Sequence, residues 1–178
     1  DILNDNLEIL LEEAIKNIAI NGLVISIVPD SLLFANKYRR SRNYLNHNGN
    51  ILALISLPKD TFKPYSQLKT SVLIFEKGKK KTSDVYVAKI KDGPSKDTFE
   101  SLTIPDVQLI TTNFDKWLHQ EKWDIKPGIS YAVPSDNIKY ENLISIYNTY
   151  SGSSNQDEKN SPLIPLSEIC LEIKKKSS

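Results

Sequence analysis

Three short apolar runs, set apart by polar segments, constrain the fold of this chain most strongly. They span residues 23–28, 51–57 and 70–75, and the first two end directly at a proline. Runs of this length are too short to cross a bilayer and are typical of buried strands. The run at 23–28 is unbroken and rich in β-branched residues, which predicts a strand covered on both faces, as in parallel sheets.

The segments between these runs predict helices. Residues 7–18 place leucine and isoleucine at helical spacing opposite acidic side chains, and Asn21-Gly22 is a good helix stop. A polar, basic helix is expected over residues 37–46, and a fourth strand over 85–90. The order helix, strand, helix, strand, strand indicates a layered α/β fold. Shorter amphipathic stretches lie at 113–120 and 140–147.

Composition excludes several classes of protein. The chain has 178 residues, a net charge of +1, one cysteine and two histidines. Cys170 cannot form an internal disulfide, and the histidines lack the close spacing of a zinc site, so we expect no metal. No secretory or membrane segment is visible, which predicts a cytoplasmic protein. Because there is no methionine, even at position 1, we interpret Asp1 as a processed or cut end.

Two blocks of sequence carry a family resemblance. Residues 22–34 read Gly-Leu-Val-Ile-Ser-Ile-Val-Pro-Asp-Ser-Leu-Leu-Phe, and residues 54–75 contain Leu-Pro, then Phe62, then Lys-Thr leading into an apolar strand. In this order and at this separation they resemble bacterial adenine-N6 DNA methyltransferases, above all the modification subunits of type I restriction systems and their single-chain relatives. The resemblance covers about residues 5–92. Residues 164–170 are similar to the opening of a target-recognition domain, although the glycine expected soon afterwards is absent.

The resemblance implies an α/β fold, the C-terminal half of a Rossmann-like S-adenosylmethionine-dependent methyltransferase sheet. The three apolar runs would be strands five to seven, the last one antiparallel, followed by a mixed α/β extension. The implied domains are 1–92 for this half of the methyltransferase domain, 93–150 for the extension, 151–161 for a linker, and 162–178 for the start of a target-recognition domain. Three strands and two helices alone would leave one sheet edge unpaired.

The implied function is part of a site-specific DNA adenine-N6 methyltransferase of a restriction-modification system. Its partners would be double-stranded DNA and specificity or restriction subunits, and the full-length protein would use S-adenosylmethionine. The chain contains no Gly-x-Gly element and no Pro-Pro dipeptide. We therefore expect neither cofactor binding nor catalysis from this chain alone, and assign it no catalytic, cofactor or metal residue. The alternatives are a non-catalytic module that docks on a partner methylase or specificity subunit, and an unrelated α/β enzyme subunit.

Phe62 is the principal site prediction. A base that is methylated must leave the duplex stack, and an aromatic side chain can repay the lost stacking. In the family, an aromatic residue in the loop between strands six and seven packs against the flipped adenine, and Phe62 resembles this position. The other interpretation is that Phe62 anchors its loop on the core. Lys63, Tyr65 and Lys69 flank it as DNA contacts or as a solvated loop.

Basic residues elsewhere suggest further DNA contacts. Lys37, Arg39 and Arg40 crowd one short helix and either contact phosphates or form a solvated face. Arg42, in the same helix, is expected to turn inward and pair with a carboxylate. Of the remaining candidates, we expect the lysines of 77–81 to form a soluble turn, and Trp117 and Trp123 to serve as core or interface anchors. Asp30 is expected to cap the turn that follows it, and the alternative is that it borders the cofactor pocket.

Overall fold

The computed structural model describes residues 2–59, 61–78, 84–90, 104–125 and 129–148. Its centre is a five-stranded sheet with the strand order β1-β3-β2-β4-β5. The strands are β1 Leu23–Pro29, β2 Gly49–Ser56, β3 Thr70–Lys77, β4 Val85–Lys89 and β5 Ser130–Val133. The mixed α/β fold predicted from the sequence is confirmed, and the three apolar runs form the first three of these strands.

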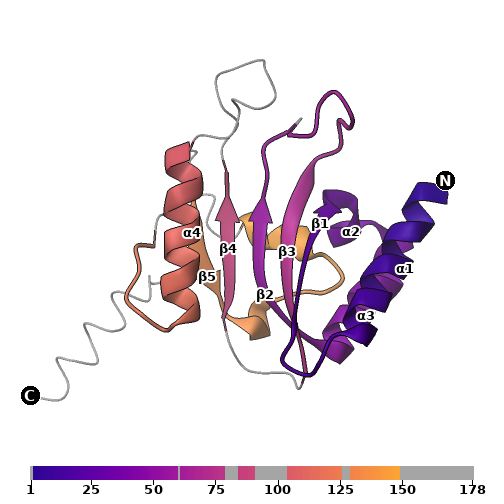
Figure 1. The fold of residues 1–178 in the computed structure, drawn as a ribbon, viewed down its shortest axis with the longest axis horizontal. Helices are drawn as coiled ribbons and strands as arrows, with labels where there is room; N and C mark the ends of the chain where they lie inside the picture. The colour runs from indigo at the N-terminus through magenta and orange to yellow at the C-terminus, as the bar shows by residue number, and fades with distance from the viewer. Residues whose placement is uncertain (1, 60, 79–83, 91–103, 126–128, 149–178) are drawn as a thin grey trace, which may run out of the picture.

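The direction of the strands follows from the position of β3. This strand lies between β1 and β2 and is antiparallel to both, as predicted for the third apolar run. β4 then pairs parallel to β2, and β5 pairs antiparallel to β4. Strands β1, β2 and β4 therefore run in the same direction, and their carboxyl ends meet at one edge of the sheet (Figure 1).

Helices cover both faces of the sheet. Helices α1 (Ile2–Asn17), α2 (Asp30–Phe34) and α3 (Arg39–Asn48) lie on one side, and α4 (Ile104–Leu118) lies over the other side at β4 (Figure 1). The 3-10 helices are η1 Asn36–Tyr38, η2 Ser135–Asn137 and η3 Leu143–Asn148. The helices predicted at 7–18 and 37–46 are confirmed within a few residues, and the helix predicted at 113–120 is the end of the longer α4. No helix in the described part of the chain combines the length and apolar character that crossing a membrane requires.

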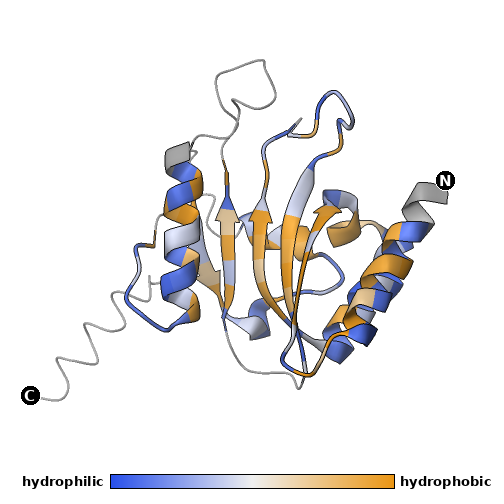
Figure 2. Ribbon diagram, in the orientation of Figure 1, coloured by the Kyte–Doolittle hydropathy of each residue, from blue (hydrophilic) through white to orange (hydrophobic). Residues whose placement is uncertain are grey.

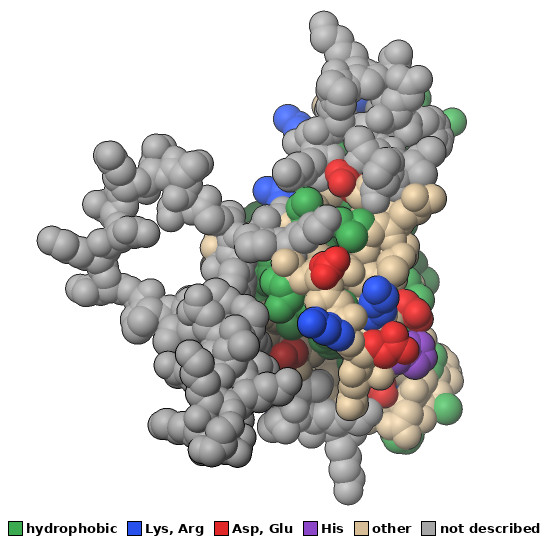
Figure 3. All heavy atoms as spheres, turned by 90° about the vertical axis from the view of Figure 1, so that its left-hand side faces the viewer, with side chains coloured by type: hydrophobic (Ala, Val, Ile, Leu, Met, Phe, Trp, Pro, Cys, Tyr) green, Lys and Arg blue, Asp and Glu red, His purple; other side chains and the backbone are tan. Residues whose placement is uncertain are grey.

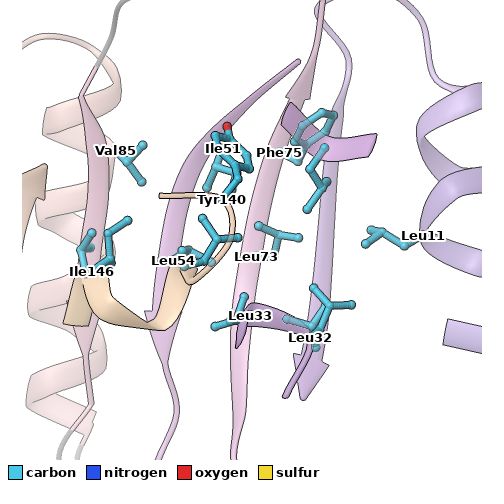
Figure 4. Close-up of a cluster of buried hydrophobic side chains, with 14 of the residues drawn as sticks. Leu11, Leu32, Leu33, Ile51, Leu54, Leu73, Phe75, Val85, Tyr140 and Ile146 are labelled. Carbon is cyan, nitrogen blue, oxygen red and sulfur yellow. The ribbon is translucent and has the colours of Figure 1, made fainter. Parts of the chain in front are cut away.

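The larger core lies between the sheet and helices α1 to α3. Leu54 and Leu73 extend from the central strands toward Leu33 of α2, and Leu11 of α1 approaches from the edge of the sheet (Figure 4). Ile146 of η3, almost a hundred residues after β2 in the sequence, also packs in this core. The segment after residue 93 thus completes the same core as the first half, through β5 and η3.

The second core lies beneath α4 and is aromatic. The ring of Tyr86 is 5.4 Å from that of Phe114, 5.9 Å from that of Trp117 and 5.5 Å from that of Trp123, measured between centroids. The Tyr86 hydroxyl donates to the Ile110 carbonyl at 2.9 Å, and burial raises the pKa of Tyr86 to about 12. The expected anchoring role of both tryptophans agrees with this packing.

One sheet prediction is wrong. The strand at 23–28 is covered on only one face, because Leu23, Ile25 and Ile27 are 48%, 68% and 51% exposed while Val24 and Val28 are buried. The strand is apolar along its length (Figure 2), but α4 packs over β4 and leaves β1 uncovered. We call these three exposed side chains the bare face of β1.

The two neighbouring leucines of α1 test this packing. Leu11 is 4% exposed and Leu10 is 67% exposed. We expect Leu11→Ala to lower the free energy of unfolding by about 2–5 kcal/mol, because it leaves a cavity in the larger core. Leu10→Ala is the matched control and should change it by less than about 0.5 kcal/mol. Urea denaturation followed by circular dichroism measures both, and equal losses would contradict the assigned helix face.

Candidate functional site

The candidate site lies at the sheet edge where β1, β2 and β4 end. Ligands of open α/β sheets bind outside the carboxyl ends of the strands. At this edge the Asp30 amide donates to the Lys69 carbonyl at 2.9 Å, and the Leu57 amide donates to the Thr70 carbonyl at 3.0 Å. These bonds fix both ends of the loop that joins β2 to β3, residues 57–69, which we call the β2–β3 loop.

Hydrogen bonds within the β2–β3 loop hold its shape. The Thr61 hydroxyl donates to the Pro58 carbonyl at 2.7 Å, and the Ser66 amide donates to the Phe62 carbonyl at 2.9 Å. The Leu68 amide donates to Ser66 Oγ at 3.2 Å. The Lys69 ammonium donates to the Leu57 carbonyl and ties the two ends of the loop together. The described part of the loop therefore has a defined conformation, which can present side chains in fixed directions.

Phe62 occupies an intermediate position in this loop. Its side chain is half-buried and packs against the aromatic core on the α4 side. The ring is neither sealed in the interior nor free in solvent. It anchors the loop, as the second interpretation of the sequence proposed, and it also keeps accessible surface at the carboxyl edge. Its contact with a base stays a prediction.

The residues that flank Phe62 differ in exposure. Tyr65 is 92% exposed and Leu68 is 60% exposed, so both side chains point away from the core. Lys63 and Lys69 are half-buried, and both have interactions within the protein. The sequence predicted Lys63, Tyr65 and Lys69 as DNA contacts, and the structure places all three in the same loop as Phe62.

A buried chain of hydrogen bonds stands behind this edge. The Tyr147 hydroxyl donates to Ser71 Oγ at 3.0 Å, and the Ser71 hydroxyl donates to Asp30 Oδ1 at 2.7 Å. Burial raises the pKa of Tyr147, so its phenol stays protonated and remains a donor. The prediction that Asp30 caps the following turn is wrong, because its carboxylate accepts from β3 instead. Sequence reasoning missed Ser71 and Tyr147, which have no local signal.

Arg42 holds α3 to its surroundings. The side chain is 1% exposed, and its Nε donates to the Tyr140 carbonyl at 2.8 Å. Its Nη1 donates to the Leu32 and Ala35 carbonyls, each at 2.9 Å. Burial, followed by the charge of Arg39, lowers the pKa of Arg42. The inward orientation is as predicted, but the hydrogen-bond partners are carbonyl oxygens, whereas the sequence suggested a carboxylate.

The other basic residues of this segment point outward. Lys37, Arg39 and Arg40 are exposed. The Lys37 ammonium lies 4.7 Å from the centroid of the Tyr38 ring, and Arg40 Nε lies 3.8 Å from Glu12 Oε1. Helix α3 packs on the larger core, whereas Phe62 packs on the α4 side of the sheet. The structure thus divides the predicted DNA contacts into two groups on different faces.

The side of the molecule that carries α4 has charged side chains of both signs. Basic and acidic side chains alternate over the described residues of this side (Figure 3). The Nδ1 atom of His119, just after the end of α4, lies 3.4 Å from Oδ1 of Asp115, and both side chains are exposed. Within the described ranges, no group of three histidine, cysteine, aspartate or glutamate side chains is placed to hold a metal ion.

Comparison with known proteins gives two findings. A model of the family described as N-6 DNA methylase matches residues 4–159. Among solved structures, a chain from a study of the assembly and conformational transition of the type I R-M system aligns with a TM-score of 0.56 and 17% identity, over 96% of this chain and 36% of that one. The type I restriction-modification methyltransferase subunit of Streptococcus thermophilus aligns with a TM-score of 0.51 and 18% identity, over 73% of this chain and 25% of that one.

These two alignments show that the fold is shared, and they show that this chain spans only about a third and a quarter of the two solved chains. A search of curated proteins gave no match.

Substitution of Arg42 and of Arg40 tests whether the buried arginine stabilises the fold and the exposed one does not. Arg42→Ala leaves buried carbonyls without donors, so we expect it to lower the free energy of unfolding by about 3 kcal/mol or more. Arg40→Ala, at an exposed position, should change stability by less than about 0.5 kcal/mol. Thermal or urea unfolding measures both. If Arg42→Ala unfolded like the native chain, the bonds to the carbonyls would not stabilise the fold.

Proposed function

The chain belongs to the N-6 DNA methylase family, and from this membership we propose that it is the carboxyl-terminal part of an S-adenosylmethionine-dependent DNA methyltransferase. The whole protein transfers a methyl group to N6 of adenine in a specific sequence of double-stranded DNA. It acts in a restriction-modification system, together with specificity or restriction subunits, in the cytoplasm. The chain itself supplies half of the sheet and one wall of the base pocket.

The observation that carries the proposal is the bare face of β1. Leu23, Ile25 and Ile27 are exposed on an edge strand that has no charged residue in its sequence. Natural edge strands are protected by charges, prolines or a covering element. Of these protective features, the sequence of β1 contains only a proline, at its last position. A strand of this kind fits a seam, where the cofactor-binding half of the methylase domain pairs with β1 and covers its bare face.

The proposed base pocket lies at the carboxyl edge of the same strands. Phe62 offers part of its ring there, on a loop fixed to the sheet at both ends. Base–aromatic stacking contributes about 1–3 kcal/mol, which is comparable to the few kcal/mol needed to extrude a base. In the proposed complex Phe62 stacks on the extruded adenine. The cofactor and the catalytic loop come from the other half of the domain.

The proposed DNA contacts form two groups on different faces of the sheet. Lys63, Tyr65 and Lys69 lie in the β2–β3 loop, and Lys37, Arg39 and Arg40 precede or begin α3. Basic side chains of this kind fix the register of a duplex through its phosphates without reading its sequence. Lys69 has a second role, since its ammonium also holds the loop closed. A free-standing module that docks on a partner methylase would use the same bare face of β1.

Assembly of the two halves tests the seam. We expect the isolated chain to show no binding of S-adenosylmethionine by titration calorimetry, and to bind the cofactor when co-expressed with the preceding half of the methylase. Ile25→Lys buries an unpaired charge at the seam and should weaken co-purification of the halves by about tenfold or more. Ile9→Lys is the matched control, because Ile9 is 58% exposed on α1, and it should leave assembly unchanged.

Two results would contradict this account of the seam. Binding of S-adenosylmethionine by the isolated chain would place a cofactor site within it. Equal effects of Ile25→Lys and Ile9→Lys would mean that β1 does not form the contact.

Phe62 is tested in the intact methylase. Phe62→Ala should lower kcat/KM for adenine methylation by about 10- to 100-fold, the equivalent of one lost base–aromatic stack. Phe62→Trp keeps an aromatic face and should retain most of the activity. The measurement is transfer of tritiated methyl groups to duplex DNA, with circular dichroism to confirm folding. Equal activity of the alanine and tryptophan variants would assign Phe62 to loop anchoring alone.

A further inference from the structure

Tyr65 stands out among the exposed side chains. At 92% it is the most exposed large apolar side chain in the described part of the protein, and Leu68, in the same loop, is 60% exposed. Pro64 beside it is also exposed. A tyrosine carries about 150–250 Å² of surface, and leaving it in water forgoes the stabilisation that burial would give. Tyr65 is absent from both core clusters, so its ring is available to a partner.

The loop turns Phe62 and Tyr65 in different directions. The bond from the Ser66 amide to the Phe62 carbonyl at 2.9 Å closes a turn around residues 62–66. Phe62 packs against the core, whereas Tyr65, three residues later, is exposed to solvent. Because both ends of the β2–β3 loop are bonded to the sheet, the projecting side chain is held at the carboxyl edge. We call Tyr65 and Leu68 the prong.

An extruded base leaves a gap in the duplex. The base pairs on either side of this gap offer apolar faces that the prong could contact. Proteins that distort DNA insert apolar side chains between base steps and so compensate for lost stacking. The flat ring of Tyr65 matches the face of a base pair, and the branched side chain of Leu68 adds apolar surface. The lysine-bearing loop around them fits a polyanion. Phe62 is unsuited to this task, because its ring is partly committed to the core.

We propose that Tyr65, supported by Leu68, enters the duplex at the position the target adenine vacates and stacks on the neighbouring base pairs. This inference rests on the proposed function. It assigns two aromatic side chains of one loop to two steps: Tyr65 stabilises the duplex that has lost a base, and Phe62 contacts the base that has left. Tyr65 is thus a positioning residue that lowers the free energy of the flipped state.

The experiment uses the intact methylase and two duplexes that contain its methylation site. In one the target adenine pairs with thymine, and in the other it lies opposite an abasic position, where extrusion costs less. Tyr65→Ala should lower kcat/KM about tenfold or more on the paired duplex and approach the native value on the abasic duplex. Phe62→Ala should lose activity on both. Gln67→Ala, at an exposed position of the same loop, is the control.

A spectroscopic readout separates insertion from other roles. With 2-aminopurine in place of the target adenine, native protein should raise the fluorescence of the paired duplex, and Tyr65→Ala should raise it less. Tyr65→Phe keeps the ring and should behave as native protein. A loss in Tyr65→Phe as large as in Tyr65→Ala would assign the hydroxyl to a phosphate and overturn insertion.

The remaining outcomes are also decisive. Native activity of Tyr65→Ala on the paired duplex, or an equal loss on both duplexes, would overturn the prong while leaving the methyltransferase assignment intact. Absence of adenine methylation by the native intact protein would overturn the proposed function, and the prong with it.

Discussion

The position of β3 between β1 and β2 determines most of what this protein can do. Because β3 is antiparallel to both neighbours, β1 and β2 must run in the same direction. Their carboxyl ends then share an edge with that of β4, and the chain must cross this edge to pass from β2 to β3. The topology of the sheet therefore places the β2–β3 loop at the edge where ligands of open α/β sheets bind, which is the candidate site.

Two sets of buried polar contacts keep this edge in place. Arg42 gathers the carbonyls of Leu32, Ala35 and Tyr140, so α2, α3 and the segment before η3 are joined through one guanidinium. Ser71 joins Asp30 to Tyr147 in the same way. Both sets connect the first part of the chain to residues 140–148. Buried polar groups of this kind are costly unless fully bonded, so they favour one arrangement of these elements over others.

Much of the fold follows from local signals in the sequence, and the failures have identifiable causes. The strands at 23–28, 51–57 and 70–75 and the first helix follow from apolar spacing. The helix itself ends at Asn17, before the stop expected at Asn21-Gly22. Strand β5 was missed because Ser130–Val133 is only four residues long and is stabilised by pairing with β4. The coverage of β1 was misjudged because an unbroken apolar run does not say what lies above it. Within the site, the sequence shows that Phe62 and Tyr65 are neighbours, but the difference in their exposure depends on tertiary packing.

The bare face of β1 also has a consequence for the life of the protein in a cell. An apolar strand with an open hydrogen-bonding edge is a template for strands of other molecules, including further copies of the same chain. While β1 is uncovered, aggregation, chaperone binding and proteolysis compete with the pairing of β1 to the element that covers it. In the proposed methylase this cover is the preceding half of the same polypeptide, which is synthesised first, so β1 would be covered as soon as it forms.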